Sequence, residues 1–202
     1  MGPEASPNTS AHLVLASSSP QRRKLLEEAG YAFRVIEPSA SAERDDPSGC
    51  TPGAYAARAA YRKVVDAAGT LAAESSLGQR IVGCDTVAAC EGKILGKPKD
   101  RDDARRMLEL LRGREHEVYS GLCVWHWPND EPVTEVAVTR LKMEPLTDAA
   151  IEDYLASGAW QGKAGAFGYQ DRPGWLRILE GSESNVIGLP MELLERILTA
   201  TA

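Results

Sequence analysis

The sequence lacks the features that mark membrane, secreted and nucleic-acid-binding proteins. In its 202 residues, no apolar run approaches the roughly 20 residues that a membrane span requires. Residues 1–10 contain no hydrophobic signal core. There is no long basic run and the net charge is −6, whereas a protein that binds a phosphate backbone needs a broad cationic face. We therefore expect a cytoplasmic protein whose partners include neither nucleic acid nor membrane.

The motifs of covalent catalysis are also missing. The chain has neither G-x-S-x-G nor the Walker A pattern. Its two strand histidines, His116 and His126, have no partner at metal-ligand spacing, so we interpret them as ordinary strand residues. No C-x-x-C pair occurs, which predicts reduced thiols that pack as small apolar side chains. These thiols are Cys50, Cys84, Cys90 and Cys123.

The length and composition fit one compact unit or two small lobes that share a cleft. About 43% of the residues are apolar, which is enough for an ample core. Residues 1–10 are rich in proline, serine, asparagine and threonine and have little to bury, so we expect a disordered lead-in. Residues 11–202 are then expected to form a single domain.

The stretch 81–98 organises the rest of the chain. Ile81 to Cys90 is almost uniformly apolar, Glu91-Gly92 can form a turn, and Lys93 begins a return segment, a pattern that predicts a hairpin. Asp85 lies within the apolar run. A buried carboxylate is costly unless a cation, a metal or hydrogen-bond donors satisfy it. One interpretation is a functional carboxylate near Lys97; the alternative is that Asp85 caps a loop or accepts from backbone donors.

A strand, loop and helix open the ordered chain. The pattern predicts a strand at 12–16, a polar loop at 17–19, and a helix that begins at Pro20, is capped by Ser19 and ends at Gly30. Arg22 and Arg23 fall in the first turn of this helix, where the helix dipole already places positive charge. They either bind an anion or point into solvent.

Two further segments precede the central hairpin. After a second strand at 31–36, the polar loop 37–49 carries Glu43, Asp45 and Asp46, and we interpret it as a lid. A helix is predicted from Thr51 to about Ala68, with Gly69 at its end and residues 71–79 as a connector. Lys63 on this helix faces either a cleft or water.

The second half of the chain is predicted to be mostly scaffold. We expect a helix from Asp100 to Gly113, an antiparallel pair of strands at 115–127 and 133–143 with a bulge near residues 138–139, and helices at 147–157 and from Pro190 to about Leu198. Residues 181–189 appear turn-rich. Residues 163–170 form a glycine-spaced loop with Lys163 as its cation, where a backbone can approach a ligand closely.

The unusual residues are mainly cations without a nucleophile. Arginines and lysines suit the oxygens of a polyphosphate, a divalent ion can bridge them to carboxylates, and Asp85 can position or deprotonate a water molecule. These residues predict hydrolytic phosphoryl or nucleotidyl chemistry. The cations are Arg22, Arg23, Lys63, Lys97 and Lys163.

Five separated motifs together resemble the Maf family of nucleoside triphosphate pyrophosphatases. They are LASSSPQRRKLL at 15–26, GCDTV at 83–87, LGKP at 95–98, KAGAFGYQ at 163–170 and SNVIGLP at 184–190. Their order and spacing agree with the family from about Leu13 to Leu198. The resemblance implies an α/β fold with a mixed sheet in two lobes around a cleft, related to the inosine triphosphatases. It also implies a divalent metal cation (Mg²⁺ or Mn²⁺), often a homodimer, and hydrolysis of a nucleoside triphosphate to the monophosphate and pyrophosphate.

The resemblance also suggests roles for individual residues. Asp85 corresponds to the general base or metal-associated carboxylate, Lys63 and Lys97 to phosphate ligands, and Ser17 and Arg22 to the phosphate-binding loop and helix start, next to Arg23. Glu43 corresponds to the metal-binding glutamate if one residue is inserted after Gly30. Gly162 stands where the family commonly has an aspartate.

Base specificity is carried by three positions in this comparison. Thr86 and Gln170 match the branch of the family that acts on dTTP and UTP. Gln21 differs from both main branches, which carry arginine or an aromatic residue there. The leading hypothesis is a pyrophosphatase for dTTP, UTP or modified forms of them. The alternatives are a preference for 7-methyl-GTP or CTP, a nucleotide sensor that regulates cell division without turnover, and a scaffold domain with solvated cations.

Overall fold

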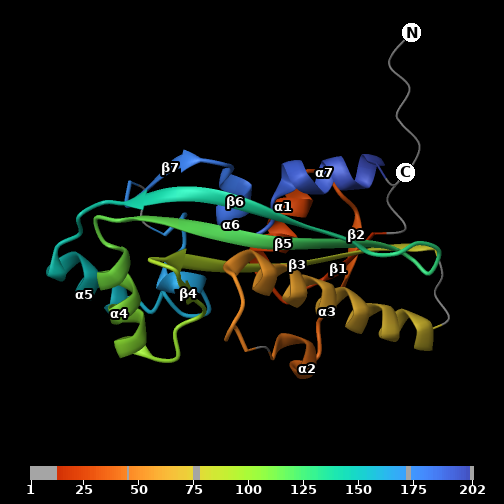
Figure 1. Cartoon of the computed structure of the whole chain (residues 1–202), viewed down its shortest axis with the longest axis horizontal. Helices are drawn as coiled ribbons and strands as arrows, with labels where there is room; N and C mark the ends of the chain where they lie inside the picture. Colours follow the sequence, from red (N-terminus) through yellow and green to blue (C-terminus); the bar gives the residue numbers. More distant parts are fainter. Residues whose placement is uncertain (1–12, 45, 75–77, 172–173, 201–202) are drawn as a thin grey trace, which may run out of the picture.

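One mixed sheet runs through the whole protein, with helices on both of its faces (Figure 1). The computed structural model describes residues 13–44, 46–74, 78–171 and 174–200. The expected lead-in at 1–10 and Asp45 therefore lie outside the described residues. The elements in chain order are β1 (Leu13–Ala16), α1 (Pro20–Glu28), β2 (Phe33–Ile36), α2 (Ala40–Glu43), α3 (Pro52–Ala73), β3 (Gln79–Cys90), β4 (Lys93–Leu95), α4 (Arg101–Leu111), β5 (Glu115–Trp127), β6 (Val133–Met143), α5 (Asp148–Ala156), the 3₁₀ turn η1 (Ala164–Ala166), β7 (Leu176–Glu180), α6 (Glu183–Ile187) and α7 (Met191–Ala200).

The sheet combines a parallel and an antiparallel part. Its strand order is β2-β1-β3-β5-β6-β7, and β4 pairs with β3 beyond the end of β1. Strand β1 is parallel to both β2 and β3, and the remaining pairs are antiparallel. The predicted hairpin and the long antiparallel pair are confirmed.

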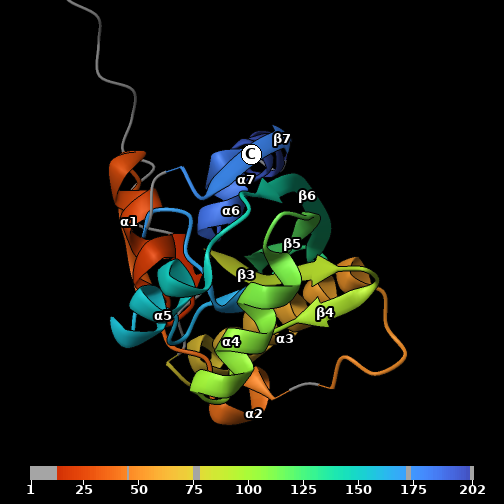
Figure 2. The same ribbon diagram turned by 90° about the vertical axis from the view of Figure 1, so that its left-hand side faces the viewer.

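Three clusters of buried side chains divide the molecule into two lobes. In the first lobe, α3 packs against one face of the sheet through Val64 and Ile81, and α1 and α7 pack against the other face through Leu26 and Leu194. In the second lobe, α4 and α5 cover the far ends of the long strands, as Figure 2 shows from that end. Strands β3 and β5 extend through both lobes. The expected α/β fold with two lobes is thus confirmed.

The helices begin where the sequence predicts them to begin. The side chains of Ser19, Thr51, Asp100 and Thr147 each accept a hydrogen bond from the backbone N–H three residues further on. Such caps satisfy one of the free N–H groups of a helix start. Polar residues ahead of an apolar periodic run therefore located four helix starts correctly.

Four predictions about the helices and the bulge were wrong. Helix α3 does not end at Gly69 but continues to Ala73, because Leu71 extends its buried face and is fully buried. The segments 37–49 and 181–189 contain the short helices α2 and α6, which are capped by Ser39 and Ser182. The irregularity in β6 lies between Arg140 and Leu141, two residues beyond the predicted bulge.

Helix α3 contacts the sheet through two glycines that lack room for a side chain. A Cβ atom on Gly83 would lie 2.6 Å from Val64 Cγ2, and a Cβ atom on Gly121 would overlap the backbone carbonyl of Ala56. Small residues on the buried face of α3, including Ala56 and Ala60, permit this approach. The separation between α3 and the β3–β5 pair is therefore fixed by backbone contacts.

We expect Gly121→Ala to lower the free energy of unfolding by about 3 kcal/mol, because the added methyl group must displace helix backbone and cannot be relieved by a rotamer change. The matched control is Gly69→Ala, at an open position inside the same helix. This control should raise the free energy of unfolding by about 0.5–1 kcal/mol through helix propensity. Urea denaturation followed by circular dichroism measures both changes. A Gly121→Ala variant as stable as the wild type would contradict the described contact.

Candidate active site

The central cavity lies where the edge of β3 is left uncovered. The pairing of β1 with β3 ends at Ala16–Gly83, and the pairing of β4 with β3 begins only at Leu95–Ala88. From β1 the chain passes through α1 to β2, which pairs with one edge of β1, whereas β3 pairs with the other edge. The carboxyl end of β1 is therefore a topological switch point of the parallel part of the sheet. Ligands in open α/β sheets bind outside the carboxyl ends of strands at such points.

Two consecutive residues of β3 face opposite sides of the sheet at this gap. Successive side chains of a strand alternate between its faces. Asp85 therefore faces α3 and bonds to its Lys63, whereas Thr86 faces α1 and bonds to its Arg22. Both residues line the cavity. The strand thus brings cations from two distant helices to one opening.

Lys63 lies between two carboxylates. Its Nζ atom is 2.7 Å from Asp85 Oδ1 and 3.3 Å from Glu43 Oε1. Lys63 is only 3% exposed, and the side chain of Asp85 is 19% exposed. Since a buried ammonium needs anionic partners, this triad both satisfies the lysine and holds the carboxylate of Asp85 toward the cavity. Lys63 therefore faces the cleft and not water.

Helix α2 brings Glu43 to this triad. Both the backbone N–H and the hydroxyl of Ser39, the N-cap of α2, donate to the carboxylate of Asp66 on α3, at 2.9 and 2.6 Å. At the other end of α2, Arg62 donates to the carbonyl of Ala42 at 3.4 Å. These contacts dock α2 on α3 one turn away from Lys63. The segment that was interpreted as a loop is thus a helical support for Glu43.

Arg22 is buried without an acidic partner. It is 8% exposed, and in the described part of the chain no carboxylate forms a salt bridge with it. Its Nε donates to the carbonyl of Gly188 at 2.8 Å, Nη1 to the hydroxyl of Ser17 at 3.2 Å, and Nη2 to that of Thr86 at 3.3 Å. Three of its five N–H donors are thereby used. The guanidinium is held in one orientation and keeps its positive charge available for an anion.

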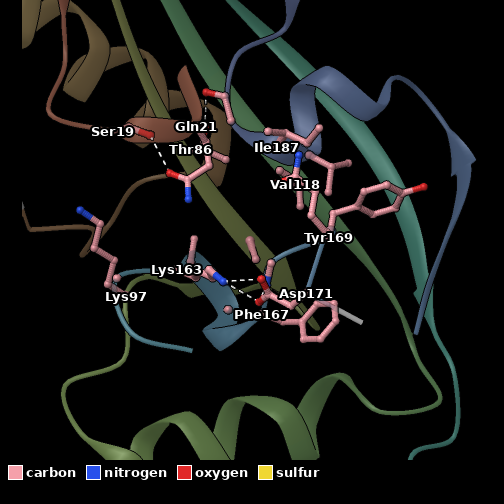
Figure 3. A pocket seen from close by; sticks show the side chains of 18 of the residues that line it. Ser19, Gln21, Thr86, Lys97, Val118, Lys163, Phe167, Tyr169, Asp171 and Ile187 are labelled. Atoms are coloured by element: carbon pink, nitrogen blue, oxygen red, sulfur yellow. Dashed lines mark hydrogen bonds and ion pairs between the residues drawn. The ribbon is translucent and has the colours of Figure 1, made fainter. Parts of the chain in front are cut away.

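The loop between β1 and α1 orients Gln21. The hydroxyl of Ser19 donates to Gln21 Oε1 at 3.2 Å, which turns the amide nitrogen of Gln21 toward the cavity (Figure 3). Ser18 and Ser19 also line the cavity. Ser17 does not reach it: this residue is 1% exposed and supports Arg22 from behind.

Arg23 is not brought to the cavity. It follows Arg22 by one helical position and points away, and its Nη2 forms an ion pair with Glu37 Oε1 at 2.8 Å. It is not among the residues that line the cavity. Residues one apart on a helix lie about 100° apart around its axis, which is why Arg22 and Arg23 point in different directions here.

Lys97 reaches the cavity from the segment after β4. It is exposed and lines the opening, and Figure 3 shows its ammonium group at one side of it. The carbonyl of Gly96 accepts a hydrogen bond from the N–H of Gly165 at 3.1 Å. This bond ties the segment that carries Lys97 to η1 within the second lobe.

The segment 163–171 forms the opposite wall. Lys163 was predicted to be a cation available to a ligand, but its Nζ atom lies 2.5 Å from both carboxylate oxygens of Asp171. Sequence reasoning missed Asp171, although a carboxylate directly after Gln170, in a loop with a single lysine, was a usable signal. Tyr169, Gln170 and Asp171 all line the cavity.

The cavity combines a charged opening with an apolar interior. Its volume is about 290 Å³, close to the lower end of the range for small-molecule sites. The interior is lined by apolar side chains, most of them from the second lobe, namely Leu111, Val118, Leu141, Met143, Phe167 and Ile187. Such a cavity can take a molecule with an anionic part and a flat, weakly polar part.

Among the described residues, neither a thiol nor an imidazole provides a nucleophile near Asp85. Burial raises the pKa of the Cys84 thiol, and its Sγ donates to the carbonyl of Gly188 at 3.3 Å. Burial lowers the pKa of His116, which keeps that imidazole neutral. Cys84 is thus a packed thiol, as predicted, and the other three cysteines are free as well.

The carboxylates fit a hard divalent cation that is shared with a substrate. Within the described residues, no group of three His, Cys, Asp or Glu side chains could hold a metal by itself. However, Glu43 and Asp85 meet at Lys63 and line the same cavity. Mg²⁺ typically uses one or two carboxylates, several waters and substrate phosphates. This pair of oxygen ligands matches that pattern.

None of the described helices is both long and apolar enough to cross a bilayer. The longest helix, α3, has 22 residues but carries Arg58, Arg62, Lys63 and Asp66.

Comparison with known proteins agrees with the motifs. The family described as "Maf-like protein" matches residues 12–201. A "dTTP/UTP pyrophosphatase" of Rhodopirellula baltica is 47% identical over 194 residues, which span 96% of this chain and 83% of that protein. A "dTTP/UTP pyrophosphatase" of Geotalea uraniireducens is 39% identical over 182 residues, 90% of each chain.

Among solved structures, the Ham1 protein of Staphylococcus aureus has a similar fold. The match has a TM-score of 0.51 and 15% sequence identity, and it covers 95% of this chain and 100% of that chain. At this identity the likeness concerns the fold alone, and it agrees with the arrangement of the mixed sheet described above.

Proposed function

Because this chain belongs to the Maf family, we propose that it is a nucleoside triphosphate pyrophosphatase that acts on dTTP, UTP or modified forms of them. Residues 11–202 would constitute one catalytic domain. One observation carries the proposal: the cavity at the switch point collects Asp85, Glu43 and Lys63 together with two cations that have no carboxylate partner among the described residues, Arg22 and Lys97.

The triphosphate is proposed to bind at the charged opening. Arg22, Lys63 and Lys97 supply positive charge from three elements, and Ser18 and Ser19 stand at the start of α1. Phosphate groups bind favourably at helix starts and to guanidinium groups. Ser17 contributes indirectly, since it orients Arg22. We leave Arg23 out of this role, because it pairs with Glu37 and does not line the cavity.

Asp85 is proposed to activate the attacking water. In this reaction the water oxygen attacks the α-phosphorus, the bond between the α-phosphorus and the bridging oxygen breaks, and pyrophosphate leaves. Asp85 accepts the proton that the water loses, since its carboxylate is partly exposed to the cavity and is fixed by Lys63. Arg22, Lys63 and Lys97 stabilise the charge that develops on the phosphate oxygens.

A divalent cation, Mg²⁺ or Mn²⁺, is proposed as the cofactor. Glu43 and Asp85 would hold it, because they are the two carboxylates that converge at the opening. When bound, such an ion neutralises phosphate charge and polarises the phosphoryl group.

The base is proposed to occupy the uncharged side of the cavity. Gln21 and Gln170 line the cavity, and their amide groups can pair with the carbonyl and N–H groups of a pyrimidine. Thr86, the third proposed specificity position, lines the cavity beside Arg22. Buried polar groups that stay unpaired with a wrong base would provide the discrimination. We also propose a cytoplasmic homodimer, on the family resemblance alone; light scattering of the purified protein tests the oligomeric state.

A substrate panel tests the proposed function. We expect the purified protein, with Mg²⁺ or Mn²⁺, to release pyrophosphate and not orthophosphate from dTTP and UTP, and to lose this activity when the metal is chelated. CTP and 7-methyl-GTP complete the panel, since a preference for either would reassign the base. Nucleotide-dependent stabilisation without any pyrophosphate release would instead indicate a sensor. If no nucleotide stabilises the protein against thermal unfolding, only a scaffold role remains.

A further inference from the structure

The segment 163–171 is closed on itself by one carboxylate. The backbone N–H of Asp171 donates to the carbonyl of Gly168 at 3.0 Å, and Asp171 Oδ2 accepts from the N–H of Gly168 at 3.1 Å. These two bonds close a four-residue turn in which Tyr169 and Gln170 occupy the central positions. Both of these residues line the cavity.

The same carboxylate ties this turn to the rest of the second lobe. Asp171 accepts from Lys163 Nζ at 2.5 Å and from the hydroxyl of Tyr154, on α5, at 2.5 Å. The Lys163–Asp171 pair joins the two ends of the segment (Figure 3). The side chain of Asp171 is only 17% exposed, so these partners are not readily exchanged for water.

The two side chains of the ion pair pack closely against Gly168. A Cβ atom on Gly168 would lie 2.8 Å from Asp171 Oδ2 and 3.0 Å from Lys163 Cδ. Below the carboxylate, the rings of Tyr154, Phe167 and Trp175 pack with centroids 5.1 to 5.6 Å apart. The turn therefore has a rigid base.

The ion pair also determines which end of a nucleotide this wall can contact. Lys163 is neutralised by Asp171, whereas Arg22 and Lys97 are not neutralised by any described carboxylate. A triphosphate is attracted to the opening with unpaired cations and not to a neutral pair. The wall at 163–171 is left for the base.

From these contacts we propose that Asp171 is a positioning residue for base recognition, which acts by holding the turn that carries Gln170 and Tyr169. This inference rests on the proposed function, because it assigns the base to the 163–171 wall. A rigidly held amide discriminates between bases better than a loosely held one, which can adapt to a wrong base. Lys163 accordingly serves this wall as the partner of Asp171 and is not a phosphate ligand.

The test uses Asp171→Asn, which keeps the shape of the side chain but removes its charge. We expect the KM for the preferred nucleotide to rise about tenfold, with kcat changed less than about threefold. The ratio of kcat/KM between the preferred nucleotide and the other pyrimidine triphosphates should fall about fivefold or more. Protection against thermal unfolding by inorganic tripolyphosphate, which has no base, should be unchanged.

Two further variants keep the result interpretable. Tyr154→Phe removes one hydrogen bond to the same carboxylate and should shift selectivity in the same direction by a smaller factor; it carries the test if Asp171→Asn does not fold. Glu135→Gln, the control, breaks the ion pair with Arg196 at 2.6 Å, away from the cavity, and should alter neither selectivity nor KM.

Three outcomes overturn the inference. Unchanged selectivity in Asp171→Asn would show that the carboxylate does not govern the base. Equal losses for every nucleotide, together with weaker tripolyphosphate protection, would show a merely structural role. A selectivity change of equal size in Glu135→Gln would remove the link to this wall. If the wild type releases no pyrophosphate from any nucleotide, the proposed function fails instead, and that result is distinct from these three.

Discussion

Replacement of Asp85 by asparagine is expected to reduce kcat by a factor of about a hundred or more, while KM stays within about threefold of the wild-type value. The amide has nearly the shape of the carboxylate but cannot accept a proton from water. Its oxygen can still accept from Lys63, which donates to Asp85 at 2.7 Å, so the phosphate-binding cations should keep their positions. Steady-state release of pyrophosphate gives kcat and KM, and thermal shift with nucleotide checks affinity.

The matched control for this prediction is Asp148→Asn. Asp148 is exposed at the start of α5, pairs with Arg112 at 2.5 Å and does not line the cavity. The Asp148→Asn variant should retain full turnover. If Asp85→Asn turns over nucleotide at close to the wild-type rate, Asp85 is not the general base. The cations would then have to account for catalysis.

Replacement of Lys63 by methionine is expected to affect stability and activity together. Removing one partner of a buried ion pair leaves the other charge uncompensated, which costs about 3–5 kcal/mol in fully buried pairs. Since Asp85 and Glu43 are 19% and 34% exposed, water offsets part of this cost, and we expect a loss of about 2 kcal/mol in the free energy of unfolding. The kcat/KM should fall by about a hundredfold or more, because the proposed phosphate ligand and the anchor of Asp85 are lost together.

A double variant separates the cost of the uncompensated carboxylate from the other effects of losing Lys63. In Lys63→Met/Asp85→Asn the uncompensated carboxylate is removed as well, so about 1 kcal/mol of stability should return relative to Lys63→Met. Urea denaturation measures this coupling. Lys24→Met is the control: Lys24 is 65% exposed in its pair with Glu28, so its loss should cost less than about 0.5 kcal/mol. Additive losses in the double variant would mean that Lys63 and Asp85 do not interact.

The parts of the fold that depend on local chemistry could be predicted from the sequence. The hairpin of β3 and β4 follows from an apolar run, the Glu91-Gly92 turn and a short return segment. The starts of α1 and α3 follow from Ser19 and Thr51, each of which precedes a proline at the first helical position. These signals need only a few neighbouring residues, which explains why they are reliable.

The parts that depend on tertiary contacts could not be predicted in the same way. Gly69 is a good helix terminator in isolation, yet α3 passes through it because Leu71 is buried against the sheet. Helix α2 has only four residues and is held by Asp66 and Arg62 on α3, which lie far away in the sequence. No local pattern contains that information.

The candidate site shows the same division. The unusual position of Asp85 in an apolar strand could be recognised from the sequence, and the structure brings it to Lys63, Glu43, Arg22 and Lys97. The different environments of Arg22 and Arg23 could not be foreseen, because they depend on which face of α1 meets β3. The pairing of Lys163 with Asp171 depends on a turn that closes only when Gly168 is in place.

The contact of α3 with the bare backbone of Gly83 and Gly121 limits how this protein can diversify. Any sideways movement of the helix would carry Lys63 away from Asp85, so this wall of the cavity keeps its position against the sheet. On the proposed function, we expect adaptation to a new nucleotide to occur in the segments that contain Gln21 and Gln170. Directed evolution of altered specificity should accumulate its substitutions in those two segments and leave the helix-to-strand contact untouched.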